Sequence, residues 1–231
     1  MDGTKEIGDE SDKIINIITL GESGVGKTSI IKRYVYGTFE EETISTIGLN
    51  FGYKIITLSD NNKIKLKLVD TAGQERYRAL NKNYFKNGEA VLYVFSFDKI
   101  GSFDKIKEWK QMFSENQTGE GIPSFLIRNK CDLDENDGLD SDKIHERDLE
   151  IIDDDTINKF VEENNFSKYV ISSAKDDKNI KNIFQEISEI WYKNNKGLKK
   201  KQTTKVLQNT DEKEKKEKKK RRKCFLCKED L

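Results

Sequence analysis

The stretch that most constrains this chain of 231 residues is G-E-S-G-V-G-K-T at residues 21–28. It fits the pattern G-x-x-x-x-G-K-[ST] of a phosphate-binding loop, and it lies between an apolar run at 14–20 and a segment at 29–34 that can open a helix. Glycines let backbone N–H groups turn towards an anion, and a helix N-terminus adds partial positive charge there. We expect Lys27 to reach the β- and γ-phosphates of a nucleotide, and the Thr28 hydroxyl to ligate Mg²⁺. The motif alone leaves an ATPase, or a chance match, open.

Charge is distributed unevenly along the chain, although its formal net charge is zero. Residues 196–231 contain 15 Lys and Arg against 6 Asp and Glu, so residues 1–195 carry the compensating negative surplus. This asymmetry predicts an acidic folded body and a basic tail that is attracted to anionic membrane surfaces. The first residues lack the apolar core of a signal peptide, no apolar run approaches the ~18 residues of a membrane span, and the three cysteines indicate no disulfide framework. We therefore expect the protein in the cytosol or at the cytosolic face of a membrane.

Apolar runs and alternating patterns predict a sheet interleaved with helices. Two alternating segments, 49–58 and 64–69, flank the turn-forming sequence D-N-N and should form a hairpin. The clearest helix is the last one, where apolar residues recur at helical spacing: Ile180, Ile183, Phe184, Ile187, Ile190 and Trp191. The other expected strands are 14–20, 90–95, 123–127 and 169–171, and the other expected helices are 28–36, 102–115 and 156–165. This alternation favours an α/β fold of three layers, with a mostly parallel six-stranded sheet, helices on both faces and ligands at the carboxyl ends of the strands.

The sequence D-T-A-G-Q at residues 70–74 ends one of these strands. Asp70 can hold a Mg²⁺-bound water opposite Thr28, and the Gly73 N–H can meet a γ-phosphate without a side chain in the way. Gln74 can orient an attacking water. An isolated D-x-x-G is also common as an acidic turn that caps a helix, so this motif is only moderately specific.

The sequence N-K-C-D at residues 129–132 follows another buried strand. The Asp132 carboxylate can accept two hydrogen bonds, from N1–H and the 2-amino group of guanine, whereas adenine would leave it unpaired. The stem of Lys130 can lie over the base, and Asn129 can tie neighbouring loops together. After the last strand, S-A-K at 173–175 can supply a backbone N–H to the guanine oxygen. Taken alone, the N-K-C-D stretch would be read as an ordinary polar loop.

The four motifs occur in one order, each at the end of a predicted strand, and chance does not account for that. Residues 13–195 resemble a small GTPase of the Ras superfamily. Within it the chain is most similar to the Rab family, on G-E-S-G-V-G-K-T at 21–28, S-T-I-G-L-N-F at 45–51, Q-E-R-Y-R-A-L at 74–80, and Ser102-Phe103 with Trp109.

The chain departs from the Rab pattern at several positions. Rab-like sequences usually carry Trp where Val69 stands, an acid where Asn50 stands, and a small or apolar residue where Arg128 stands. The segment 86–95 is closer to the Ras pattern. These departures bear on subfamily and effector choice, so a Ras-like signalling GTPase is the alternative.

The resemblance implies a P-loop NTPase G domain that hydrolyses GTP to GDP with Mg²⁺, slowly by itself and faster with an activator protein. Thr46 would ligate Mg²⁺ and sense the γ-phosphate, Phe39 would pack against the guanine, and a second switch would span about 70–84. Expected partners are an exchange factor, a GTPase-activating protein, effectors that recognise the switches, and an anionic membrane, but no nucleic acid. The protein would be a regulator of vesicle traffic that cycles between cytosol and membrane. A scaffold that binds GTP without cycling is a further alternative.

Motifs and resemblance together give the candidate site residues. The catalytic candidates are Gln74, Lys27 and Gly73. The metal candidates are Thr28, Thr46 and, through water, Asp70. The nucleotide-binding candidates are Gly21, Glu22, Ser23, Gly24, Val25, Gly26, Lys27, Thr28, Ser29, Phe39, Thr46, Asp70, Gly73, Asn129, Lys130, Asp132, Ser173, Ala174 and Lys175.

The chain is expected to have three parts. Residues 1–12 should form a flexible N-terminus and 13–195 the G domain, with an acidic insert at about 133–155. Residues 196–231 should form a basic tail that carries Cys224 and Cys227. The resemblance suggests prenylated cysteines there, although the ending C-F-L-C-K-E-D-L is neither C-C, C-x-C nor C-a-a-X.

Overall fold

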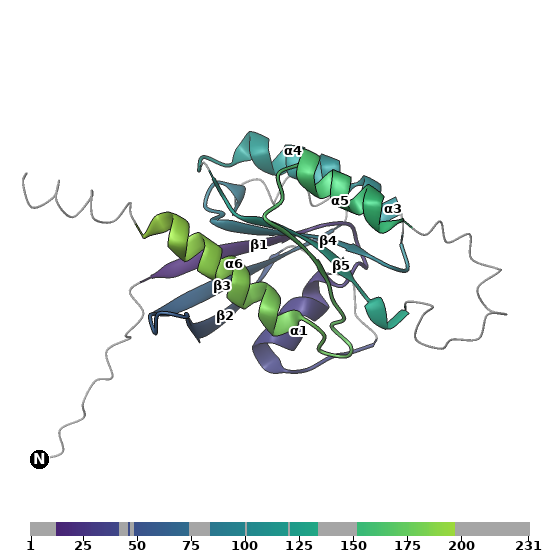
Figure 1. Ribbon diagram of the computed structural model, residues 1–231. Helices are drawn as coiled ribbons and strands as arrows, with labels where there is room; N and C mark the ends of the chain where they lie inside the picture. The colour runs from purple at the N-terminus through teal and green to yellow at the C-terminus, as the bar shows by residue number, and fades with distance from the viewer. Residues whose placement is uncertain are drawn as a thin grey trace, which may run out of the picture. The chain divides into compact units, whose positions relative to one another are not determined.

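A computed structural model describes residues 13–41, 46, 49–73, 84–99, 101–119, 121–133 and 152–196 (Figure 1). The chain divides into two units, residues 1–191 and 192–231, and of the second only 192–196 are described, the last turn of a helix and the residue after it. None of the helices in the described part is long and apolar enough to cross a bilayer. The acidic stretch at 134–151, residues 1–12 and the tail beyond 196 lie outside the described residues.

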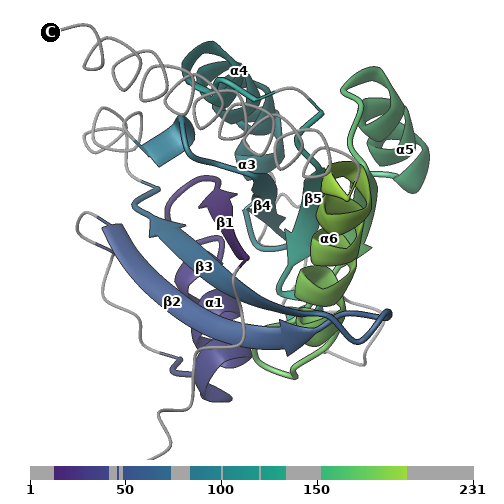
Figure 2. The ribbon, with the colours of Figure 1, turned by 90° about the vertical axis from the view of Figure 1, so that its left-hand side faces the viewer.

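The sheet has six strands in the order β2-β3-β1-β4-β5-β6. β1 (Ile14–Leu20) lies between β3 (Lys63–Thr71) and β4 (Ala90–Ser96) and is parallel to both, and β5 (Ser124–Asn129) and β6 (Lys168–Ile171) continue in parallel. β2 (Leu49–Thr57) pairs antiparallel with β3 at one edge, as Figure 2 shows. The predictions of a mostly parallel six-stranded sheet and of a hairpin are therefore confirmed.

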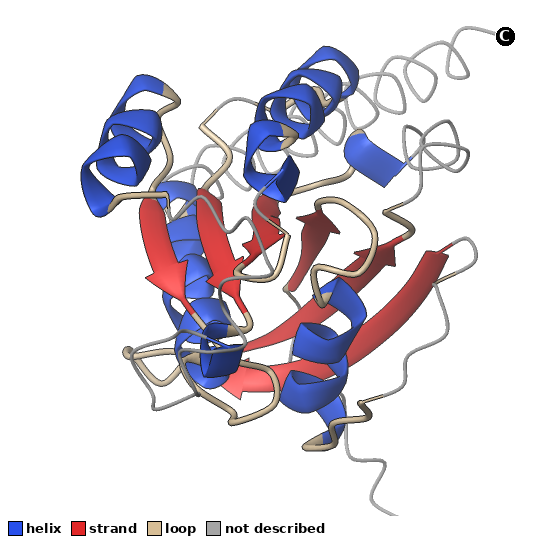
Figure 3. Ribbon diagram, turned by 90° about the vertical axis from the view of Figure 1, so that its right-hand side faces the viewer, coloured by secondary structure: helices blue, strands red, loops and turns tan. Residues whose placement is uncertain are grey.

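Helices cover both faces of the sheet (Figures 1 and 3). α1 (Lys27–Tyr36) and α6 (Ile180–Asn195) share one face, where the Tyr34 and Phe184 rings stack with centroids 4.0 Å apart. α3 (Gly101–Asp104), α4 (Ile106–Asn116) and α5 (Asp154–Glu163) cover the other, together with the aromatic pair Phe103 and Phe160. A short 3-10 helix, η2 (Cys131–Leu133), follows β5. The three predicted layers are present.

The hydrophobic core follows the periodicity of the sequence. On α6, Ile180, Ile183, Phe184, Ile187 and Trp191 are buried, as their helical spacing predicts. On the opposite face, a cluster that includes Tyr93, Phe95, Trp109, Phe113 and Leu126 packs between the sheet and α3, α4 and α5. The core holds the strands in register, so the loops at their carboxyl ends have a rigid base.

Two helix predictions need correction. The single helix expected at 102–115 is two helices, because the chain turns at Lys105. Hydrophobic spacing did not reveal the break, since Phe103 and Ile106 are buried on both sides of it. The helix expected at 156–165 begins earlier, at Asp154, because the Asp153 side chain accepts a hydrogen bond of 2.7 Å from the Thr156 N–H and caps it. The end of the acidic run therefore serves as a helix N-terminus.

Candidate functional site

The phosphate loop joins β1 to α1 at the carboxyl edge of the sheet. Gly26 precedes α1 with φ 92°, and a Cβ added there would lie 2.2 Å from Asn129 Nδ2, so both the backbone conformation and the neighbour require glycine. α1 begins without a side-chain cap and without an acidic residue in its first turn. The first N–H groups of the helix are therefore available to an external anion.

Lys27 extends back along this loop. Its ammonium group donates hydrogen bonds of 2.8 Å to the carbonyl oxygens of Gly21 and Glu22, and the residue is 5 % exposed. Burial lowers the pKa of Lys27 to about 8, while the charges of Asp70 and Glu22 act in the opposite direction. An ammonium group has three donors, so one remains for an anionic ligand.

Three oxygen-bearing side chains converge beside Lys27. Thr28 Oγ1 donates to Asp70 Oδ2 at 2.7 Å, and Thr46 Oγ1 lies 2.7 Å from Thr28 Oγ1. Because the Thr28 proton goes to Asp70, Thr46 is the donor in the second pair. Asp70 Oδ1 is buried without a hydrogen-bond partner. Burial raises the pKa of Asp70, and the Thr28 hydrogen bond and the Lys27 charge oppose this.

This donor set fits a small hard cation. Hydroxyl and carboxylate oxygens are the ligands that Mg²⁺ takes, usually with one or two carboxylates and several waters. The buried, unpaired Asp70 Oδ1 is an acceptor for a cation-bound water. In the described part of the chain, no group of three or more His, Cys, Asp or Glu side chains is arranged to hold a metal ion. Two hydroxyls and one carboxylate leave further positions on such a cation to waters and to oxygens of a bound ligand.

Gly73, just after β3, contacts the phosphate loop backbone directly. A Cβ added to Gly73 would lie 2.5 Å from the Glu22 carbonyl carbon and from the Ser23 nitrogen. The D-x-x-G motif and the phosphate loop thus meet without intervening side chains. Gln74 lies outside the described residues.

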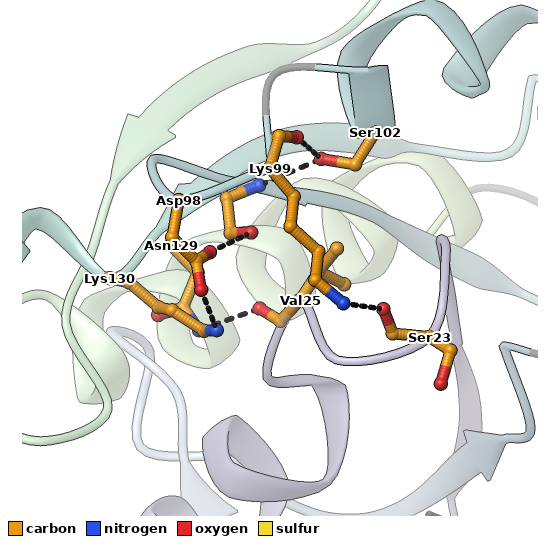
Figure 4. Close-up of polar contacts among 8 residues, drawn as sticks. Ser23, Val25, Asp98, Lys99, Ser102, Asn129 and Lys130 are labelled. Carbon is orange, nitrogen blue, oxygen red and sulfur yellow. Dashed lines mark hydrogen bonds and ion pairs between the residues drawn. The ribbon is translucent and has the colours of Figure 1, made fainter. Parts of the chain in front are cut away.

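The N-K-C-D motif is tied to the phosphate loop by a buried amide. Asn129 is 1 % exposed, and its Nδ2 donates to the Val25 carbonyl at 3.0 Å (Figure 4). Its Oδ1 accepts from Ser172 Oγ at 3.2 Å. Asp132 Oδ1 accepts a hydrogen bond of 2.6 Å from Ser173 Oγ. The motifs after β5 and β6 therefore meet on one side of the phosphate loop.

Lys130 is held by a partner that the motif does not contain. Its backbone has φ 65°, and its ammonium group pairs with Asp98 Oδ2 at 2.6 Å (Figure 4). Burial by itself would raise the pKa of Asp98, but hydrogen bonds from Lys130 and Ser96, with the Lys130 charge, bring that pKa below its ordinary value. Asp98 therefore stays ionised and fixes the Lys130 stem.

A cavity of about 260 Å³ lies where these elements meet. The predicted residues that line it are Ser23, Gly24, Gly26, Lys27, Thr28, Ser29, Phe39, Thr46, Gly73, Asn129, Lys130, Asp132, Ala174 and Lys175. Three lining residues were not predicted: Glu40, Glu41 and Leu133. Gly21, Glu22, Val25, Asp70 and Ser173 stand behind the lining and contact it through the hydrogen bonds and backbone links above. Cys224 and Cys227 lie outside the described residues.

Arg33 on α1 is a residue of the site that the sequence did not single out. Its guanidinium donates to the carbonyl oxygens of Ala174 and Lys175, both at 2.8 Å, and to that of Gly37 at 2.9 Å. It also lies 5.8 Å from the centroid of the Phe39 ring. One side chain thus holds the S-A-K loop and the segment that carries Phe39.

Replacement of Arg33 by methionine should free the S-A-K loop and accelerate GDP dissociation about tenfold, because three charge-assisted hydrogen bonds are lost. Stopped-flow measurement with a fluorescent GDP analogue gives the rate. Lys32→Met is the control on the same helix: it also removes a positive charge, but that charge forms an exposed ion pair with Glu40 and holds neither Ala174 nor Lys175, so the rate should change less than twofold. Equal rates in the two variants would contradict this role of Arg33.

Comparison of the sequence with known proteins shows the family to which the chain belongs. The model of the Ras family matches residues 16–193. The Ras-related protein Rab-7L1 of Homo sapiens is 30% identical over 186 residues, which are 79% of this chain and 85% of that protein. The Ras-related protein Rab-32C of Dictyostelium discoideum is 34% identical over 76% of this chain and 72% of its own length, and the GTP-binding protein ypt3 of Schizosaccharomyces pombe is 35% identical over 78% and 76%. The chain therefore belongs to the Ras family, and among these small GTPases it is most like the Rab proteins.

Proposed function

We propose that the cavity described above binds GTP and GDP with Mg²⁺, and that this GTPase acts as a Rab-like switch in vesicle traffic. The observation that carries the assignment is the Asn129 side chain, which joins the base motif to the Val25 carbonyl of the phosphate loop. One rigid unit can therefore hold a nucleotide by its phosphates at Lys27 and by its base at Asp132.

At the phosphate end, binding is electrostatic. The N–H groups of the loop and of the start of α1, together with the buried Lys27 ammonium, face a polyanion. Bound Mg²⁺ would neutralise charge on the phosphates, with Thr28 and Thr46 as ligands and Asp70 acting through water. The protein's contribution is preorganisation, because Asp70 and Lys27 are fixed before the ligand arrives.

At the base end, Asp132 distinguishes guanine from other bases. Its Oδ1 is oriented by Ser173, and the carboxylate accepts from N1–H and the 2-amino group of guanine. The Lys130 stem, anchored by Asp98, covers one face of the base. The backbone N–H groups of Ala174 and Lys175, on the loop whose carbonyl oxygens Arg33 holds, would donate to the guanine oxygen.

Hydrolysis requires an oriented water and stabilisation of charge in the transition state. We assign the orientation of the attacking water to Gln74. We assign stabilisation of the negative charge in the transition state to Lys27 and the backbone N–H of Gly73. We expect slow intrinsic hydrolysis and acceleration by an activator protein. Thr46 and Gly73 are the points at which the two switch segments depend on the γ-phosphate, so they relax when it leaves.

Partners would recognise the switches and the exposed sheet edge beside them. On β2, Phe51, Tyr53 and Ile55 point away from the core and are 38%, 51% and 51% exposed, and the Phe51 ring lies 5.7 Å from that of Tyr84. Exposed apolar side chains adjacent to a switch are suited to binding effectors.

We further propose that the basic tail and Cys224 or Cys227 attach the protein to the cytosolic face of a membrane. Mass spectrometry of the native C-terminal peptide tests the attachment, and an unmodified peptide would refute lipidation.

A two-step experiment tests the proposed function. A fluorescent GDP analogue should bind tightly in Mg²⁺ and be displaced by GDP and GTP, but not by ATP at a hundredfold excess. GTP-loaded protein should then release phosphate in a single turnover. Tight GTP binding without phosphate release would instead indicate a scaffold that does not cycle, and displacement by ATP would refute the assignment of the base pocket.

A further inference from the structure

The turn that follows β4 places a second lysine against the phosphate loop. Lys99 Nζ donates to the Ser23 carbonyl oxygen at 3.1 Å (Figure 4). A Cβ built on Gly24 would lie only 2.6 Å from the same nitrogen, so the ammonium group sits directly on the loop backbone. Ser23 and Gly24 both line the nucleotide cavity. Lys99 itself does not line the cavity, so it is adjacent to the phosphate subsite through these two residues.

The backbone of Lys99 is fixed by hydrogen bonds. Its N–H donates to the Ser96 carbonyl at 3.3 Å, and its own carbonyl accepts from the Ser102 N–H at 2.9 Å and from the Ser102 hydroxyl. Ser102 Oγ in turn accepts from the Ser96 N–H at 3.2 Å (Figure 4). The turn is thus closed between the end of β4 and α3, and it directs the Lys99 side chain at the loop.

The contacts of the Lys99 ammonium group decide how much of its charge acts on the cavity. In the described part of the chain its ammonium group pairs with no carboxylate, and its polar contact is the Ser23 carbonyl. Lys27 and Lys99 therefore carry like charges close to one cavity, and an anionic ligand bound there would be attracted by both.

We propose that Lys99 is a positioning residue that supplies a second fixed positive charge to the phosphate loop and slows nucleotide release, more for GTP than for GDP. This inference rests on the proposed function of the cavity. Because Lys99 Nζ lies 3.1 Å from the carbonyl oxygen of Ser23, which lines the cavity, phosphates bound there would lie within about one Debye length of the charge, about 10 Å at 0.1 M salt, and solvent ions would screen it only in part. Because the attraction grows with ligand charge, the extra phosphate of GTP makes the effect larger.

The neighbouring residue provides an internal control. Asp98 contacts the base side of the site through Lys130, at 2.6 Å, while Lys99 contacts the phosphate side. Loss of the Asp98 carboxylate loosens the cover on the base, which is the same in GDP and GTP. Asp98→Asn should therefore accelerate release of both nucleotides equally, whereas Lys99→Met should discriminate between them.

The experiment measures dissociation of fluorescent GDP and of a fluorescent non-hydrolysable GTP analogue from the full chain in Mg²⁺. For Lys99→Met at low salt we expect dissociation roughly fivefold faster for GDP and tenfold faster for the GTP analogue, with both effects shrinking towards twofold in 1 M salt. Lys99→Arg keeps the charge and should restore rates to within twofold of the unaltered protein.

Three results would overturn the proposal. The first is an unchanged dissociation rate in Lys99→Met. The second is an acceleration that is equal for the two nucleotides and independent of salt, because Lys99 would then act only through its hydrogen bond to Ser23. The third is failure of Lys99→Arg to restore the dissociation rates. Thermal unfolding of each variant without nucleotide separates lost folding from lost binding. If the unaltered protein does not bind guanine nucleotides at all, the proposed function fails, and that result is distinct from any behaviour of Lys99.

Discussion

Replacement of Asp132 by asparagine should lower the affinity for GDP at least a hundredfold and create affinity for xanthosine diphosphate. The carboxylate accepts two hydrogen bonds from guanine, and an amide presents a donor to at least one of these guanine donors. Leaving polar groups unpaired in a closed site gives strong discrimination, and a hundredfold corresponds to about 2.7 kcal/mol. Xanthine has an oxygen in place of the 2-amino group, so the amide of the variant matches it.

Isothermal titration with both diphosphates measures this exchange of specificity. Ser173→Ala is the matched control, because it removes the 2.6 Å hydrogen bond to Asp132 Oδ1 but keeps the carboxylate. It should weaken GDP binding only severalfold and give no preference for xanthine. A variant Asp132→Asn that keeps the affinity of the unaltered protein for GDP would show that the base binds elsewhere.

Replacement of Gly26 by alanine should abolish tight GDP binding and destabilise the protein. The new Cβ would lie 2.2 Å from Asn129 Nδ2, and the backbone there has φ 92°. The strain of a positive φ and the overpacking against a buried side chain together cost roughly 2–4 kcal/mol of unfolding free energy. Displacement of Asn129 also breaks its hydrogen bond to Val25, so we expect GDP affinity to fall at least a hundredfold.

Gly121→Ala separates the two costs. Gly121 has φ 65°, similar to Gly26, but nothing lies within 4 Å of an added Cβ. It should lose about 1 kcal/mol of unfolding free energy and keep its affinity for GDP. Chemical denaturation and GDP titration of both variants give the comparison, and equal losses of GDP affinity would contradict a specific role for the Gly26–Asn129 contact.

Short contiguous motifs made much of the site predictable. Lys27, Asp70, Asn129 and Asp132 each lie at or just beyond the carboxyl end of a strand that hydrophobicity reveals, and parallel strands bring these ends to one edge. The three layers and the β2–β3 hairpin were predictable from the hydrophobic periodicity of the strands and helices. Boundaries were less predictable, because the break at Lys105 and the Asp153 cap depend on local hydrogen bonds that hydrophobic spacing does not register.

The supporting side chains could not be found in this way. Arg33 reaches carbonyls of residues 174 and 175, Lys99 reaches Ser23, and Asp98 reaches Lys130, so each partner is remote in sequence and no local pattern joins them. Arg128 stood out only as a departure from the family pattern. In the structure it is 9 % exposed, and its guanidinium lies 3.7 Å from the centroid of the Phe97 ring, an environment that only the tertiary structure defines.

Asn129 and Asp132 differ in their hydrogen-bond partners, and this difference has a consequence for how such a protein can evolve. Asn129 is hydrogen-bonded to both Val25 and Ser172, so a substitution there disturbs phosphate binding and base recognition together. The Asp132 carboxylate is bonded to Ser173, on the base side alone. A single substitution at Asp132 can therefore change the base preference and leave phosphate binding unaltered, and of the two positions Asn129 is the one at which selection should tolerate less variation.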